Sequence, residues 1–115
     1  MRLLILPLLL AGCVVNPPAD EPAVLADGDR TVEGRITAVD LEPLAYDGDG
    51  RILVELDGGG TATVLVPARS NLCQARGIGT YGDARVGDRI EVRGAVVRGG
   101  VLPCASTAHF FRVDD

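Results

Sequence analysis

The sequence predicts an all-β fold, a five-stranded barrel that follows a flexible N-terminal segment. After residue 30, apolar and polar residues alternate with a period of two in several segments, which is the pattern of half-buried strands. Glycine-rich turns separate these segments, and no long segment has the apolar spacing of a helix. Residues 68–85 lack the alternation and fall between the third and fourth expected strands, so they form an excursion from the barrel.

The first strand is expected over residues 31–41, and its pattern changes phase halfway. Val32 and Ile36 share one face, whereas Val39 and Leu41 fall on the other. A β-bulge produces such a change of phase, and it lets one long strand bend and join both halves of a barrel.

The second and third strands are expected over residues 51–56 and 61–66. Their alternating residues predict an inward face in each strand. The segment Asp57-Gly58-Gly59-Gly60 between them contains residues that tolerate positive φ, as a tight hairpin requires. The expected inward residues are Ile52, Val54 and Leu56 in the second strand and Ala62, Val64 and Val66 in the third.

The excursion of residues 68–85 is expected to contain at most one short helix, with Ser70 as its N-cap. The fourth strand follows over residues 89–97, after an entry turn at residues 86–88, with Ile90, Val92 and Val96 on one face. Gly99-Gly100 then turns the chain into a last strand that ends around residues 110–113.

This order of five strands, with an excursion between the third and the fourth, resembles the OB-fold over residues 30–113. The segment Val86-Gly87-Asp88-Arg89-Ile90-Glu91-Val92-Arg93-Gly94 looks like the entry to the fourth strand in many small OB barrels. Similar turns also open strands in SH3-like barrels and in sandwiches, which remain alternatives. The OB resemblance implies that Cys73 opens the excursion and that Cys104 begins the fifth strand.

The N-terminus resembles the signal peptide of a bacterial lipoprotein. Arg2 precedes an apolar run over residues 3–10, and Leu10-Ala11-Gly12-Cys13 looks like a lipobox. The run is too short for a membrane-spanning helix, which needs about 20 apolar residues. The resemblance implies cleavage before Cys13 and its attachment to diacylglycerol and an acyl chain such as palmitate. An ordinary secretory peptide with a chance cysteine is the alternative.

The domain organisation expected from these signals has three parts. Residues 1–12 form the signal peptide, residues 13–29 the lipidated cysteine with a flexible linker, and residues 30–115 the barrel. Cleavage would leave ten arginines against sixteen acids, a net charge of about −6. Val14 stands where lipoproteins retained at the inner membrane have an aspartate, so a lipid anchor in the outer membrane of the cell envelope is expected where the source has two membranes.

Two cysteines remain when Cys13 carries the lipid, and an even pair in an oxidising compartment predicts a disulfide between Cys73 and Cys104. Metal binding by these cysteines and His109 is the alternative, but they lack the closely spaced cysteine pair of zinc sites. His109 itself is expected to be a partly exposed residue of the last strand. Since no motif places a nucleophile or a second acid beside His109, we assign no catalytic residue, metal site or cofactor.

The segment Asp47-Gly48-Asp49-Gly50 is similar to the start of a calcium loop, because two carboxylates lie two residues apart. Its glycine falls at the fourth place rather than the sixth, and Gly58 stands where the loop needs glutamate. A solvated turn between the first two strands is therefore the favoured interpretation.

Nucleic acid is not an expected partner, although many OB barrels bind it. The chain is acidic, and it contains only two tyrosines, two phenylalanines and no tryptophan for stacking. The turns at residues 47–50 and 57–59 also resemble those of staphylococcal-nuclease-like OB proteins. That resemblance ends after Pro67-Ala68-Arg69, because no catalytic set like that of the nucleases follows.

Two function classes remain. The favoured one is a non-catalytic, membrane-anchored module that binds an envelope protein, a glycan or a small ligand through its loops, with Tyr46, Asp47, Asp49 and Tyr81 as candidate contacts. The alternative is an envelope hydrolase. It would need two carboxylates from a set such as Asp40, Asp47 and Asp83 to meet in one cleft.

Overall fold

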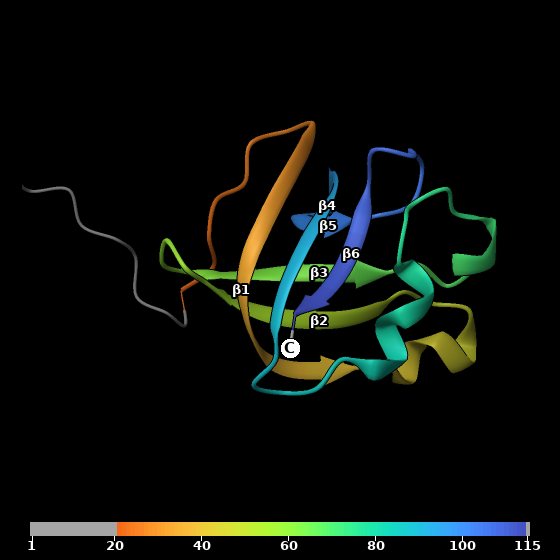
Figure 1. Ribbon diagram of the computed structural model, residues 1–115, viewed down its shortest axis with the longest axis horizontal. Helices are drawn as coiled ribbons and strands as arrows, with labels where there is room; N and C mark the ends of the chain where they lie inside the picture. The colour runs from red at the N-terminus through yellow and green to blue at the C-terminus, as the bar shows by residue number, and fades with distance from the viewer. Residues whose placement is uncertain (1–20, 115) are drawn as a thin grey trace, which may run out of the picture.

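The computed structural model describes residues 21–114, so the expected signal peptide and Cys13 lie outside the described residues. Figure 1 shows a small β-barrel with short helical turns at one end. The strands are β1 (Asp29–Asp40), β2 (Gly50–Leu56), β3 (Thr61–Val66), β4 (Arg89–Val97), β5 (Gly100–Leu102) and β6 (Phe110–Asp114). Three 3-10 helices connect them, namely η2 (Glu42–Tyr46), η3 (Ser70–Leu72) and η4 (Ile78–Asp83).

Five of the strands close into a barrel, as the sequence predicted. They pair in the order β1-β2-β3-β5-β4, and a further pairing of β1 with β4 closes the circle. The β3–β5 pairing is parallel and the others are antiparallel. This pairing is consistent with an OB-like barrel.

The long strand β1 belongs to both halves of the barrel and bends between them. Its first half pairs with β4 up to Arg35, and its second half pairs with β2 from Gly34 onward. The register shifts between Ile36 and Ala38, so the predicted bulge is confirmed. A Cβ atom at Gly34 would lie 2.0 Å from the Glu55 carbonyl oxygen, which explains why glycine occupies the place where three strands meet.

The barrel interior is filled by the inward residues of the alternating strands. Ile52, Val54, Val64, Val66 and Val92 are completely shielded from solvent, and Phe111 from β6 joins them. The expected inward faces of β2, β3 and β4 are therefore correct, although Leu56 and Val96 are only half-buried. This core and the disulfide between Cys73 and Cys104 both lie within residues 21–114. A buried core with a covalent crosslink can stabilise a domain of this size, so we expect this segment to fold alone.

The excursion between β3 and β4 differs in detail from the expectation. It contains two 3-10 helices, η3 and η4, and Ser70 begins η3 instead of capping it. Glycine at residues 77, 79 and 82 disfavours a longer α-helix here. The helix η4 packs Ile78 and part of Tyr81 against the core and so covers one end of the barrel.

The last strand is interrupted, and this corrects the expected position of Cys104. Both β5 and β6 pair with β4, but residues 103–109 leave the sheet between them. Pro103 has no N–H to continue the ladder. Cys104 therefore lies in the loop between the two pieces and not at the start of the strand.

The second half of the expected linker lies against the barrel. Ala23 N donates to the Thr61 carbonyl oxygen at 2.9 Å, and Thr61 N donates to Glu21 O at 2.8 Å. Leu25 packs against the core, and Gly28 O accepts a hydrogen bond from Val96 N. Its proline and acidic residues are typical of a flexible tether. On one side, however, the start of β3 is not covered by another of the described strands, and its backbone groups bind this segment.

Candidate functional site

A hollow of about 530 Å³ crosses the outer face of β1, β2 and β3 and ends at the turn between β4 and β5. We call it the strand groove. In OB-fold proteins, the face of strands 2 and 3, flanked by the loops after strands 1 and 4, is the usual ligand-binding surface. The residues that line the strand groove are Ala38, Asp40, Arg51, Leu53, Thr63, Leu65, Arg98, Gly99 and Gly100.

The strand register places the lining residues in rows across the sheet. Asp40 pairs with Arg51, and Arg51 pairs with Leu65, so these three form one row. Leu53 and Thr63 form part of the next row. Leu53 retains 36% of its exposure, whereas Leu65 retains 6%. The floor of the groove is thus apolar, and charged side chains line it on the β1 and β2 side.

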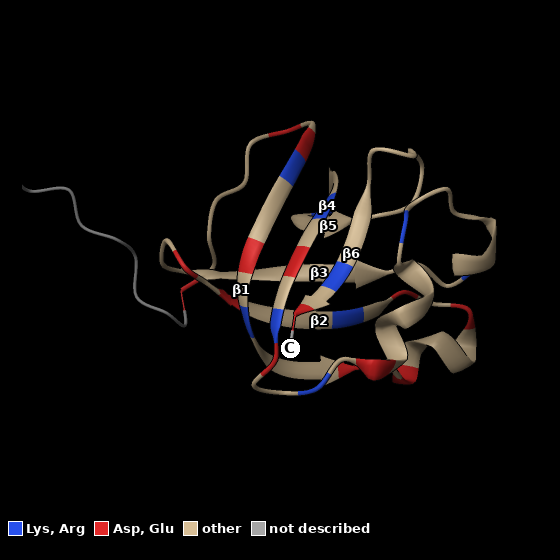
Figure 2. Ribbon diagram, viewed as in Figure 1, with Lys and Arg blue, Asp and Glu red and all other residues tan. Residues whose placement is uncertain are grey.

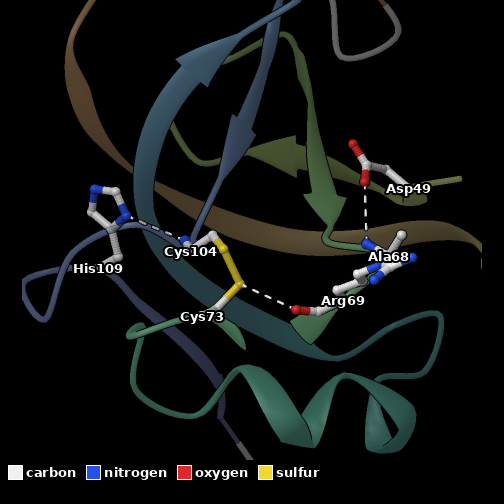
Figure 3. Close-up of a disulfide and its surroundings, with 6 residues drawn as sticks. All are labelled: Asp49, Ala68, Arg69, Cys73, Cys104 and His109. Atoms are coloured by element: carbon white, nitrogen blue, oxygen red, sulfur yellow. Dashed lines mark hydrogen bonds between the residues drawn. A yellow bond between two sulfur atoms is a disulfide. The ribbon is translucent and has the colours of Figure 1, made fainter. Parts of the chain in front are cut away.

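The wall of the strand groove at the β4–β5 turn is held by an ion pair. Arg98 has φ 51°, a left-handed conformation that is unusual for a residue with a side chain. Its Nη2 lies 2.5 Å from Asp49 Oδ2. Asp49 Oδ1 also accepts a hydrogen bond from Ala68 N at 3.2 Å (Figure 3). Asp49 therefore ties the loop before β2 to the β4–β5 turn and to the start of the excursion.

Tyr46 and Asp47 lie beside this link at the end of η2. Tyr46 is 81% exposed. Asp47 is in the left-handed region with φ 64°, and its Oδ2 lies 3.4 Å from Arg69 Nη2. The carboxylates of Asp47 and Asp49 thus engage two different arginines, and within residues 21–114 no group of three metal-binding side chains occurs. The turn interpretation of this segment fits the structure.

Tyr81 occupies a different environment from Tyr46. It lies in η4 and is half-buried against the core. Its ring therefore packs against the core, a role that the sequence did not indicate. Tyr81 does not line the strand groove.

The predicted disulfide between Cys73 and Cys104 is present in the structure (Figure 3). It joins the end of η3 to the loop between β5 and β6, and Cys104 O also accepts a hydrogen bond from Gln74 N at 2.7 Å. The bond attaches the excursion to the barrel, as expected. Because the two sulfurs are bonded to each other, neither is a thiolate that could bind metal with His109.

His109 is buried, which corrects the expectation of a partly exposed strand residue. It is 2% exposed and lies in the loop just before β6. Its Nδ1 accepts a hydrogen bond from Cys104 N at 3.2 Å (Figure 3). Its Nε2 lies 3.1 Å from Asp29 Oδ1 without the alignment of a hydrogen bond. The ring thus packs between the loop that contains Cys104 and the start of β1.

The carboxylates considered for hydrolysis do not meet in one cleft. Asp40 lines the strand groove and accepts a hydrogen bond from Glu42 N, and Asp47 is paired with Arg69. Asp83 lines a separate hollow together with Asp88. In that hollow, Asp83 is exposed and Asp88 accepts a hydrogen bond from Arg85 N, so the site lacks the buried acid of a two-carboxylate mechanism.

Arginines and acidic residues both occur along β1, β4 and β6 (Figure 2). Arg112 and Glu91 form an ion pair between neighbouring strands. Asp57 at the β2–β3 turn receives two hydrogen bonds from Arg89, the shorter at 2.6 Å. These hydrogen bonds lower the pKa of Asp57 below its ordinary value of 3.8. The described surface is therefore mixed in charge on these strands.

Of the nine residues that line the strand groove, sequence reasoning named only Asp40 as a functional candidate, and the residues that it missed include Arg51, Leu53, Leu65 and Arg98. A signal was present for two of them. Leu53 and Leu65 are apolar residues on the outward side of two adjacent alternating strands, where polar residues are expected. Arg98 is held at the groove by Asp49, which lies 49 positions away along the chain, and such a distant contact leaves no local signal in the sequence.

A scan against protein-family models finds no match to this chain, and searches of curated proteins and of solved structures find no similar protein. In the part of the chain that the structure describes, no helix is long and apolar enough to span a membrane.

Proposed function

We propose that this protein is a membrane-anchored lipoprotein of the bacterial cell envelope whose barrel is a non-catalytic binding module. The observation that carries the binding role is the strand groove, a hollow with an apolar floor and a charged side on the usual ligand face of this architecture. The lipid anchor rests on the lipobox-like segment ending at Cys13.

The position of the linker supports this proposal. Residues 21–23 pair with Thr61, at the end of β3 that adjoins the β2–β3 turn. The short helical turns η2 and η3 lie toward the opposite end of the barrel in Figure 1. A chain anchored at Cys13 would therefore reach the barrel at the end opposite these turns, leaving η2 and its exposed Tyr46 accessible to an envelope protein, a glycan or a small ligand.

The separation of the carboxylates of Asp40, Asp47 and Asp83 does not favour the alternative of an envelope hydrolase. Non-catalytic binding requires only a shaped surface with a few polar groups.

Binding can be tested by screening the fragment of residues 21–115 against a library of small polar and amphiphilic compounds with backbone amide NMR. We expect the compounds that bind to shift the amides of Leu53, Thr63 and Gly100 in the strand groove. Glu33 on β1 and Glu91 on β4, which form a cross-strand pair away from the groove, are the internal controls. Shifts confined to these control residues, or hydrolysis of library compounds by the fragment, would contradict the proposal.

A further inference from the structure

We infer that the strand groove takes a small molecule with one carboxylate joined to an apolar group, and that Arg51 binds the carboxylate. This inference rests on the proposed binding function and specifies the chemical class of the ligand. It follows from the state of Arg51, the composition of the groove floor and the position of Asp40.

The guanidinium of Arg51 has no hydrogen-bond or ion-pair partner among the described residues. No ion pair or hydrogen bond joins it to any residue between positions 21 and 114, whereas Arg98 in the same groove is held by Asp49 at 2.5 Å. Asp40 is its cross-strand neighbour, but no ion pair joins the two side chains, and Asp40 Oδ1 accepts a hydrogen bond from Glu42 N. A free guanidinium presents a planar fork of donors that matches a carboxylate in two parallel hydrogen bonds.

The floor of the groove selects an aliphatic group for the rest of the ligand. Leu53 and Leu65 lie on neighbouring strands beside Arg51, and Gly99 and Gly100 allow close approach at the far end. No aromatic side chain lines the groove, so a flat base or ring has no stacking platform there. The volume of about 530 Å³ is suited to a small molecule.

Asp40 makes a monoanion preferable to a phosphate. Its carboxylate lines the same groove, next to Arg51 in the sheet. The guanidinium of Arg51 can neutralise one negative charge, so a dianionic phosphate would keep a second charge uncompensated beside the Asp40 carboxylate. The single unpaired arginine is therefore matched in charge by one carboxylate.

The test is an NMR titration of the fragment of residues 21–115 with four probes. Hexanoate carries the carboxylate and an alkyl chain, hexanamide is its neutral counterpart, hexylamine reverses the charge, and hexyl phosphate replaces the carboxylate. We expect saturable shifts of the Leu53, Thr63 and Gly100 amides with hexanoate. We expect at least tenfold weaker binding of the other three probes.

Two variants identify the residue responsible. Arg51→Gln removes the free guanidinium from the outer face and should raise the Kd for hexanoate at least tenfold, because charge-assisted hydrogen bonds are strong. Arg93→Gln removes the same charge from β4, where Arg93 donates to Thr31, and should change the Kd less than twofold. Retained amide dispersion in both variants shows that they fold.

Each other outcome overturns the inference. Equal affinity for hexanoate and hexanamide would show that only the apolar floor binds, and tighter binding of hexyl phosphate would show that the site is for phosphate. If hexanoate leaves the groove unshifted while compounds of the general library shift it, the ligand class is wrong and the binding function stands. If nothing shifts the groove, both proposals fail.

Discussion

Asp49 and Arg98 form an ion pair of 2.5 Å between two loops that are 49 residues apart in the chain. The pair joins the loop before β2 to the β4–β5 turn, and it holds Arg98 over the end of the strand groove. The left-handed conformation of Arg98 costs free energy, since its Cβ is crowded against the backbone there. The contact with Asp49 offsets part of this cost.

We expect Asp49→Asn and Arg98→Gln to show coupled effects on stability. The asparagine keeps an oxygen that can accept the Ala68 N–H, so the first change removes mainly the charge. Both side chains are partly exposed, and we expect a coupling free energy of only about 0.3–1 kcal/mol. A double-mutant cycle by urea denaturation measures it. The coupling should shrink at high salt, and strictly additive effects at low salt would show that the pair contributes nothing.

Loss of the Cys73–Cys104 disulfide should strongly destabilise the barrel. The bond closes a loop with a sequence separation of 31 residues. A crosslink that closes a loop of this length raises the free energy of unfolding by roughly 3–4 kcal/mol in the chain-entropy model. The Cys73→Ser, Cys104→Ser double variant should therefore melt roughly 15 °C or more below the wild type in thermal unfolding followed by circular dichroism.

Reductant should lower the Tm of the wild type and leave the Tm of that double variant unchanged. Wild type and double variant are compared as the fragment of residues 21–115, which lacks Cys13. Two thiols that react with an alkylating agent in the native, oxidised fragment of residues 21–115 would contradict the disulfide.

The stability effect of Asp57 should depend on pH in the acidic range. Hydrogen bonds from Arg89 lower the pKa of Asp57 in the folded protein, so the ionised carboxylate stabilises the fold above its unfolded pKa of about 3.8. Asp57→Asn should therefore lower the Tm slightly and equally from about pH 5 upward. The difference from wild type should vanish as the pH falls through the lowered pKa.

Asp27→Asn is the matched control for this measurement, because Asp27 is exposed and has no partner among the described residues. Its Tm should follow the wild type at every pH. A difference for Asp57→Asn that grows toward low pH would have the opposite sign and would contradict the assignment.

Cys13 should carry the lipid. Expression of the full chain in a bacterial host should give a mature protein that begins at Cys13 and partitions into the detergent phase. Cys13→Ser should remain uncleaved, without lipid, since the thiol is the attachment point. Intact-mass spectrometry distinguishes the two forms. The Cys73→Ser, Cys104→Ser variant should still be lipidated, and a water-soluble mature wild type with a free Cys13 would refute the anchor.

Oligonucleotides should not bind the barrel. The chain has a formal net charge of −5, and no aromatic side chain lines the strand groove. Phosphate therefore meets net repulsion, and stacking contacts, worth about 1–3 kcal/mol per base, are missing from the groove. Fluorescence anisotropy with a labelled single strand at low salt is the most permissive measurement. Micromolar binding that weakens steeply with added salt would contradict this expectation.

The sequence by itself determined the first four strands of the barrel and the direction of their faces. The alternation of Ile52 and Val54, and of Ala62 and Val64, reports which side is buried, because successive residues of a strand point to opposite faces. The phase change in β1 predicted its bulge for the same reason. Assigning Cys13 to the lipid left two cysteines, and such an even pair predicted the disulfide, since it is expected to be bonded in an oxidising compartment.

Only the tertiary structure decided which outward residues form a site. Arg51, Leu65 and Arg98 come from three separate segments, and strand pairing brings them together in one groove. The burial of His109 and the pairing of residues 21–23 with Thr61 were likewise hidden, because both depend on partners distant in sequence. Local pattern reports the conformation of a segment, but contacts between segments depend on how the closed barrel positions them.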